Sequence, residues 1–146
     1  NDFDIDNIFF NKSVNNTVIN NGKFSRVIYS NSLYTINSLL YVVKLSNITI
    51  EQNFNRYKCF FPINKNRNII DKICNIENII LDYCDIDSKK NKKLCIQEQL
   101  DTGCIKFFEN NNSKNIKEFI LKISGVWETD KDIGLTFKFM LLKSHN

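Results

Sequence analysis

The sequence predicts an α+β fold, mainly antiparallel β, in the form of a small OB-like barrel with a prominent helix between its third and fourth strands. Three observations predict it: β-type segments lie toward both ends of the chain, an isoleucine stripe of helical period lies between them, and 146 residues suit one domain. An open α+β sandwich is the alternative. We expect a single domain over residues 1–146, with residues 1–22 as an N-terminal arm or an irregular first strand.

Three strands are predicted before the helix. Residues 24–29 and 39–45 are rich in β-branched and aromatic side chains, which favour strands, and serines and asparagines between them are typical of turns. A third strand over residues 57–61 is predicted to end at Pro62, because proline cannot donate to a sheet ladder.

A helix is predicted over residues 69–84. Isoleucines at positions 69, 73, 76 and 80 and Tyr83 recur at spacings of four and three, which predicts a core-facing stripe. Cys74 and Cys84 widen this stripe, so we interpret them as small core residues. A basic loop at 89–93 and a second helix at 94–101 follow, and Gly103 is the expected left-handed cap.

The last third of the chain reads as strands. Residues 104–108 form one candidate, and residues 119–124 and 135–142 alternate apolar and polar side chains as the two arms of a hairpin. Residues 125–134 connect these arms and contain Trp127 and two of the four glycines. We expect a loop there with a constrained backbone.

The composition limits the classes of protein. The chain has 23 Asn, 21 Ile and 17 Lys but only 3 Arg and no Ala, a bias that follows AT-rich codons and indicates an AT-rich genome. Hydrophobic residues make up 42%, too many for a disordered chain, and no run approaches the 18 apolar residues of a membrane span. The net charge of +4 permits an acidic partner.

The cysteines leave the compartment open. Five cysteines lie 9 to 15 residues apart without a C-x-x-C pair, and His145 is the only histidine, so no zinc site of usual spacing and no cofactor is expected. We favour free thiols in a reducing compartment. Disulfides in a secreted protein are the alternative, since glycosylation sequons begin at positions 11, 15, 47 and 111.

Catalysis has little support in the sequence. A single histidine provides no Ser-His-Asp or Cys-His arrangement, and four scattered glycines form no phosphate-binding loop. Two local carboxylate pairs, Asp85 with Asp87 and Asp130 with Asp132, fit solvated turns. We therefore expect a protein that is not an enzyme.

Cations and aromatic rings interleave on the predicted strands. Proteins that bind single-stranded nucleic acid need cations for the phosphates and exposed rings on which bases stack. Lys122 and Lys138 are expected together on the face of the last hairpin opposite its apolar set. Core packing of the rings and solubilising lysines are the alternative, and Trp127 also suits packing over the end of a barrel. The candidate nucleic-acid-binding residues are Arg26, Tyr41, Lys44, Lys58, Lys106, Phe108, Lys122, Trp127 and Lys138.

The segment LKISGVWETD at 121–130, followed by IGLTFKF at 133–139 and preceded by QLDTGCIKF at 99–107, resembles a closing motif of small proteins of large invertebrate DNA viruses. The resemblance implies a viral protein of the host nucleus or cytoplasm, similar to the OB-fold single-stranded DNA-binding proteins of such viruses. Those proteins often end in an acidic tail, whereas this chain ends LKSHN.

Two hypotheses follow. The first is a non-catalytic barrel that binds single-stranded nucleic acid. The second is a structural or protein-interaction module, a virion component or a secreted surface protein, whose sheet edges and Trp127 loop pair with another chain or a second copy.

Overall fold

The computed structural model describes residues 8–10, 14–16, 22–30, 35–36, 38–85, 89–109 and 118–142, with side chains from residue 38 onward. In chain order its elements are β1 (Ile8–Phe10), β2 (Val14–Asn16), β3 (Gly22–Ser30), β4 (Thr35–Ile36), β5 (Leu39–Lys44), β6 (Thr49–Asn53), β7 (Arg56–Phe60), α1 (Arg67–Cys84), β8 (Asn91–Lys93), α2 (Cys95–Asp101), β9 (Cys104–Phe108), β10 (Glu118–Glu128) and β11 (Asp132–Leu141).

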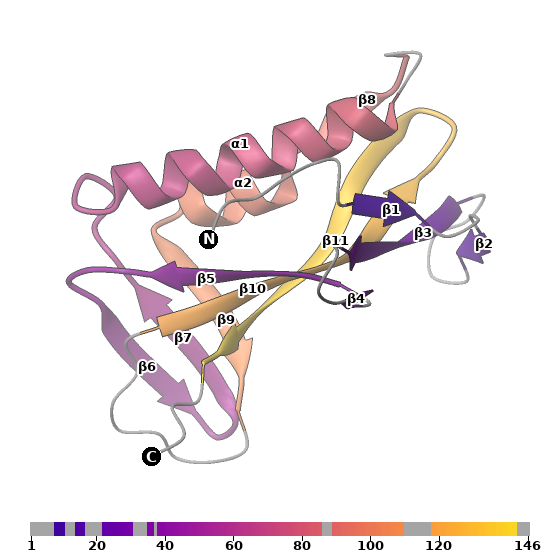
Figure 1. The fold of residues 1–146 in the computed structure, drawn as a ribbon. Coiled ribbons are helices and arrows are strands. Elements are labelled where there is room, and N and C mark those ends of the chain that lie inside the picture. The colour runs from indigo at the N-terminus through magenta and orange to yellow at the C-terminus, as the bar shows by residue number, and fades with distance from the viewer. Residues whose placement is uncertain are drawn as a thin grey trace.

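The larger sheet is built on the long hairpin of β10 and β11 (Figure 1). On its other side β10 pairs with β5 near its start and with β3 near its end. β3 also pairs with β1, β2 and β4, and the start of β11 pairs with β8 in the one parallel ladder of the described strands. The hairpin thus connects the two ends of this sheet.

The smaller sheet is antiparallel and has the order β6–β7–β9. β7 and β9 flank the helical segment in the sequence and pair with each other, as the third and fourth predicted strands would. The two sheets curl into a half-barrel, and α1 and α2 lie along one side of it (Figure 1). The predicted α+β, mainly antiparallel class is therefore confirmed.

The core lies between the helices and the inner faces of both sheets. α1 contacts α2 and β11, and α2 contacts β9 and β11. A chain of rings joins the sheets: Tyr57 stacks on Phe107 at 5.1 Å between centroids, and Phe107 meets Phe119 edge-on at 5.4 Å. Such aromatic pairs stabilise a fold beyond their buried area.

A buried carboxylate holds the start of α2. Glu77 of α1 has no exposed surface, and its two oxygens accept hydrogen bonds from the backbone N–H groups of Ile96 (2.9 Å) and Gln97 (3.0 Å). These N–H groups have no partner within their own helix. Burial raises the pKa of Glu77, and the two hydrogen bonds oppose that rise.

Buried Asn66 holds the start of α1 in a similar way. Its side-chain oxygen accepts a hydrogen bond from the backbone N–H of Ser46, and its amide nitrogen donates to the carbonyls of Ser46 and Pro62. The chain after β5 is thereby fixed against the first turn of α1.

The helices follow the predicted pattern closely. α1 buries isoleucines 70, 73, 76 and 80, but Tyr83 is 52% exposed, so its place in the predicted stripe was wrong. The inner face continues through Leu81, which is fully buried. Gly103 follows Thr102, the C-cap residue of α2, and has φ +71°, which confirms the expected left-handed cap.

The predicted loop at residues 125–134 was wrong. β10 continues to Glu128 and β11 begins at Asp132, so only three residues connect them. A register shift between Ile123 and Gly125 lets both strands continue past the point where the apolar alternation breaks. The sequence also gave no signal for β6, which is exposed except for half-buried Ile50.

The N-terminal arm predicted at residues 1–22 lies mostly outside the described residues. Its described part contains β1 and β2, each paired with β3, which itself begins at Gly22. Neither α1 nor α2 is long and apolar enough to cross a membrane.

Candidate nucleic-acid interface

The outer face of the smaller sheet gathers cations and aromatic rings. Successive residues of a strand point to opposite faces of its sheet. In β7 and β9 one face is buried in the core and carries Tyr57, Cys59, Ile105 and Phe107. The exposed side chains on the opposite face are Thr49, Glu51, Asn53, Arg56, Lys58, Phe60, Lys106 and Phe108.

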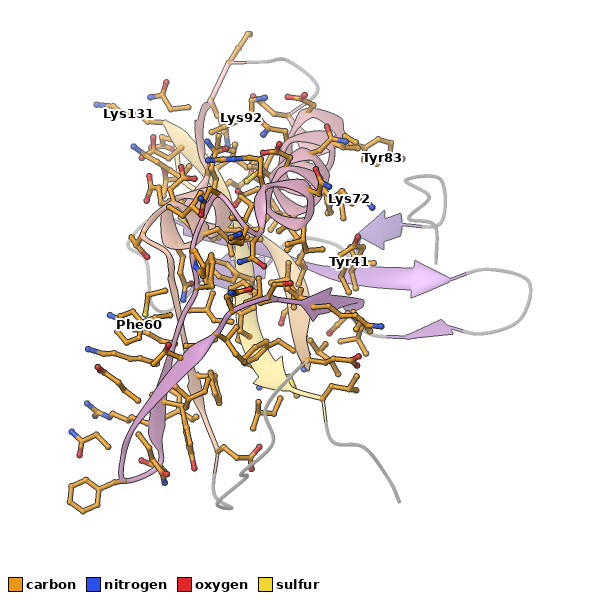
Figure 2. All side chains as sticks on the ribbon, turned by 90° about the vertical axis from the view of Figure 1, so that its left-hand side faces the viewer. Tyr41, Phe60, Lys72, Tyr83, Lys92 and Lys131 are labelled. Atoms are coloured by element: carbon orange, nitrogen blue, oxygen red, sulfur yellow. The ribbon has the colours of Figure 1, made fainter. Side chains whose placement is uncertain are left out.

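Three phenylalanines are exposed on this sheet. Phe108 is 70% exposed, Phe60 is 37% exposed, and Phe54 at the turn between β6 and β7 is 90% exposed. Phe60 lies at the side of the molecule formed by the smaller sheet (Figure 2). Exposed rings of this kind provide flat apolar surface for a ligand.

Two lysines stand directly opposite each other on this face. Lys58 of β7 is the register partner of Lys106 of β9, and Glu51 of β6 lies on the other side of Lys58. Among the described residues, neither lysine lies within 4.0 Å of a carboxylate oxygen. Like charges in this position destabilise a sheet, so the pair favours an anionic partner.

An open cleft separates β9 from β11. It has a volume of about 630 Å³ and is lined by residues 106–109, residues 137–141 and Gln99. Since consecutive residues point to opposite faces, a cleft lined by such runs is bordered by the strand edges themselves. Among the described strands, β9 pairs with β7 alone, and β11 over residues 135–141 pairs with β10 alone.

A second lysine pair lies on the far side of this cleft. Lys138 of β11 is exposed and stands opposite half-buried Lys122 of β10, with which it shares one face. Neither is ion-paired within the described part of the chain. We call the cleft with its flanking pairs Lys58–Lys106 and Lys122–Lys138, and with Phe108 at its edge, the basic cleft.

The basic cleft brings together five of the nine residues predicted from the sequence. Lys44 lies elsewhere, at the end of β5, where it pairs with Glu118 at 3.4 Å. Tyr41 is half-buried and packs against the core, and Figure 2 shows it toward the opposite side of the molecule from Phe60. The backbone of Arg26 pairs with Gly125, and its side chain lies outside the described part of the structure.

Trp127 is also away from the basic cleft. It is half-buried on β10 opposite Gly134 of β11, and a Cβ atom at position 134 would lie 2.5 Å from a carbon of the indole ring. The ring therefore needs a glycine beneath it. This contact favours the packing interpretation of Trp127 over a stacking platform.

Arg56 and Phe60 belong to the same face but were missing from the predicted set. Both share the outward face of β7 with Lys58, at spacings of two residues. That spacing was visible in the sequence, and it could have identified both once residue 58 was placed outward. Arg56 stands opposite Phe108, so a cation and a ring are neighbours at the edge of the basic cleft.

The basic loop at residues 89–93 forms a separate and partly neutralised group. Lys90 pairs with Glu128 at 2.8 Å, and Lys92 pairs with Asp82 of α1. The first pair ties the residue before β8 to the end of β10, and the second ties β8 to α1, so the loop adds less free charge than its sequence suggested.

The cysteines do not form a reactive centre. All five are free thiols, and burial raises the pKa of Cys59 and Cys84 to about 12 and that of Cys74 to about 11. These groups are thiols, not thiolates, near pH 7. Within the described residues no group of three or more His, Cys, Asp or Glu side chains could hold a metal ion.

Comparison of the chain with protein-family models, curated proteins and solved structures gave no significant match.

Proposed function

We propose that this protein binds single-stranded nucleic acid along the basic cleft. The observation that carries the proposal is a cleft lined on one side by Lys106 and on the other by Lys138, each of which has a second lysine, Lys58 or Lys122, as its cross-strand partner. A polyanion that crosses the cleft would contact both pairs and relieve their repulsion. Phosphate contacts of this kind supply most of the affinity in sequence-independent binding.

The exposed rings favour a single strand over a duplex. Phe60 and Phe108 lie on the same face as Arg56, Lys58 and Lys106. In a duplex the faces of the bases are already stacked inside the helix, whereas in a single strand they are free to stack on aromatic side chains.

The finer description of the fold belongs to the same proposal. We infer an OB-type half-barrel, in which α1 and α2 lie between the third and fourth barrel strands, β7 and β9. The segments that carry the viral resemblance overlap the end of α2 and most of β9, β10 and β11, which line or border the basic cleft. A source among large invertebrate DNA viruses, and a place in the host nucleus or cytoplasm, are the corresponding parts of the proposal.

Charge reversal on each side of the cleft tests the proposal. The variants K58E/K106E and K122E/K138E would be compared with wild type by fluorescence anisotropy, using a labelled 20-nucleotide single strand over a salt series. Each double variant should bind more weakly, and its slope of log K against log salt should be about 1.4 smaller in magnitude, because two phosphate contacts are lost.

Lys72 offers a matched control. It is exposed on α1, away from Phe60 in Figure 2, so K72E makes one charge reversal, half of that in each double variant, without touching the basic cleft. K72E should bind nearly as wild type does. Absence of binding at low salt, or an equal loss of affinity in K72E, would show that the basic cleft is not a nucleic-acid site.

The apolar outer face of β5, β10 and β11 favours a second candidate function, a protein-interaction module. Leu40, Val42 and Leu142 are 48%, 43% and 37% exposed, beside half-buried Ile120 and Met140. A complex in size-exclusion chromatography that survives nuclease and is lost in V42D would support this candidate; Val42 stands opposite Ile120, whereas Leu40 stands opposite Lys122 of the basic cleft.

A further inference from the structure

We infer that the basic cleft holds an unstacked nucleobase, while the lysine pairs on its two sides hold the neighbouring phosphates. This inference rests on the proposed function and specifies which part of a single strand enters the molecule.

The lining of the cleft has the polarity that a base requires. Six of its ten lining residues are apolar; Phe107 and Phe139 are themselves buried in the core, so the rings and chains that can face a ligand include Phe108, Phe137 and Met140. The four polar lining residues are Gln99, Lys106, Glu109 and Lys138. A volume of about 630 Å³ lies within the range of pockets for small organic ligands. The lining is therefore compatible with the apolar faces of a heterocyclic ring.

Hydrogen-bonding groups for the edge of a base come from the backbone. The edge of β9 and the facing edge of β11 over residues 135–141 share no ladder with each other or with any third described strand, so N–H and C=O groups of both edges border the cleft. Gln99 of α2 adds a side-chain amide to the lining. Donors and acceptors of this kind read the edges of unpaired bases.

The charge beside the cleft argues for a polyanion over an uncharged polypeptide strand as the occupant. Lys106 and Lys138 line the cleft, and Glu109 is the one carboxylate among its lining residues. Among the described residues, neither lysine is ion-paired. A nucleotide supplies both the phosphate that these lysines favour and a ring for the apolar part of the lining.

Phe108 is the ring placed to stack on such a base. It lies at the edge of the cleft, two residues along β9 from Lys106, and 70% of its surface is exposed. A base in the cleft could contact this ring while the adjacent phosphate contacts Lys106. The charge on the lysines thus selects a nucleotide over an uncharged aromatic ligand.

The test separates base from backbone. Two labelled probes of equal length and charge would be used: oligo(dT) of 12 nucleotides, and the same sugar–phosphate chain with every base removed. Wild type should bind the base-containing probe about 5- to 150-fold more tightly, the usual range for one stacked base. F108A should lose most of this preference while it binds the base-free probe as wild type does.

F54A is the matched control, because Phe54 is 90% exposed on the same sheet but does not line the cleft. It should keep the preference for bases. Equal, salt-dependent binding of both probes by wild type would overturn the base pocket and leave the proposed function standing, whereas failure to bind either probe would overturn both. Displacement of oligo(dT) by poly-glutamate of equal charge at lower concentration would identify a polypeptide as the ligand and also overturn the base pocket.

Discussion

Glu77 shows how one residue can place a helix. Its carboxylate lies in the core between α1 and α2, where its oxygens are bonded to backbone N–H groups of Ile96 and Gln97. Burial disfavours the charged form, whereas hydrogen bonds from a helix start favour it. The net result is a raised pKa, so the position of α2 depends on a group whose protonation changes with pH.

The raised pKa predicts how stability changes with pH. The pKa of Glu77 in the folded protein is above its ordinary value of 4.5, so between the two values the native state binds more protons than the unfolded state. The contribution of Glu77 to the free energy of unfolding is then fully present below pH 4.5 and is lost as the pH rises through the folded pKa. Urea unfolding of wild type and E77Q between pH 4 and 7 measures this contribution. The free energy of unfolding of wild type minus that of E77Q should fall as the pH rises. If this difference instead rose with pH, the hydrogen bonds from α2 would stabilise the ionised form of Glu77 more than burial destabilises it.

At the scale of the element, the ladder between β7 and β9 contains a destabilising pair of like charges at the proposed binding site. Lys58 and Lys106 are direct cross-strand partners, although a cross-strand Lys–Glu pair would stabilise the ladder. The row that crosses the sheet reads Glu51, Lys58, Lys106. A negative charge at the third position would complete an alternating row.

K106E should therefore stabilise the protein while it weakens nucleic-acid binding. We expect a gain of about 0.2–0.5 kcal/mol in the free energy of unfolding, small because the pair is exposed. Urea unfolding at low and high salt measures the gain, which salt should reduce. K106Q removes the repulsion without adding an attraction, so its free energy of unfolding should lie between those of wild type and K106E. Destabilisation in K106E would show that Lys106 is held by contacts that favour the cation.

Periodicity predicted the elements better than it predicted their partners. The isoleucine spacing identified α1, and the alternation over residues 119–124 and 135–142 identified most of β10 and β11. The same alternation placed Lys122 and Lys138 on one face, as their register confirms. β6 was not predicted because only one of its side chains, that of Ile50, is half-buried. An exposed strand has no alternation of apolar and polar residues from which it could be recognised.

The site itself depended on tertiary packing that no local pattern contains. The cleft exists because the edge of β9 faces the edge of β11, strands that are separated by β10 in the sequence. Tyr41 and Trp127 were candidates on residue type alone, and burial separates them from Phe108. The sequence of a strand shows which side chains share a face, but it does not show which of the two faces other parts of the molecule will cover.

At the scale of the whole molecule, the two sheets are joined through their inner faces. Phe107 of the smaller sheet is 2% exposed and contacts both Tyr57 and Phe119, the latter in the larger sheet. Because α2 also contacts both β9 and β11, the sheets share one core. The prediction of a single domain requires that this core unfold as one unit.

Phe107→Leu tests that cooperativity. The substitution removes both ring contacts from a buried position, so we expect a loss of about 1–3 kcal/mol in the free energy of unfolding. Trp127, the only tryptophan, reports on the larger sheet, so urea unfolding by its fluorescence and by far-UV circular dichroism should give one shared, lowered midpoint. Phe108→Leu, at the exposed neighbouring position, should stay within about 0.5 kcal/mol of wild type. If the fluorescence midpoint stayed at its wild-type value while circular dichroism showed two transitions, the sheets would be two units, and the basic cleft would lie between separately folding parts.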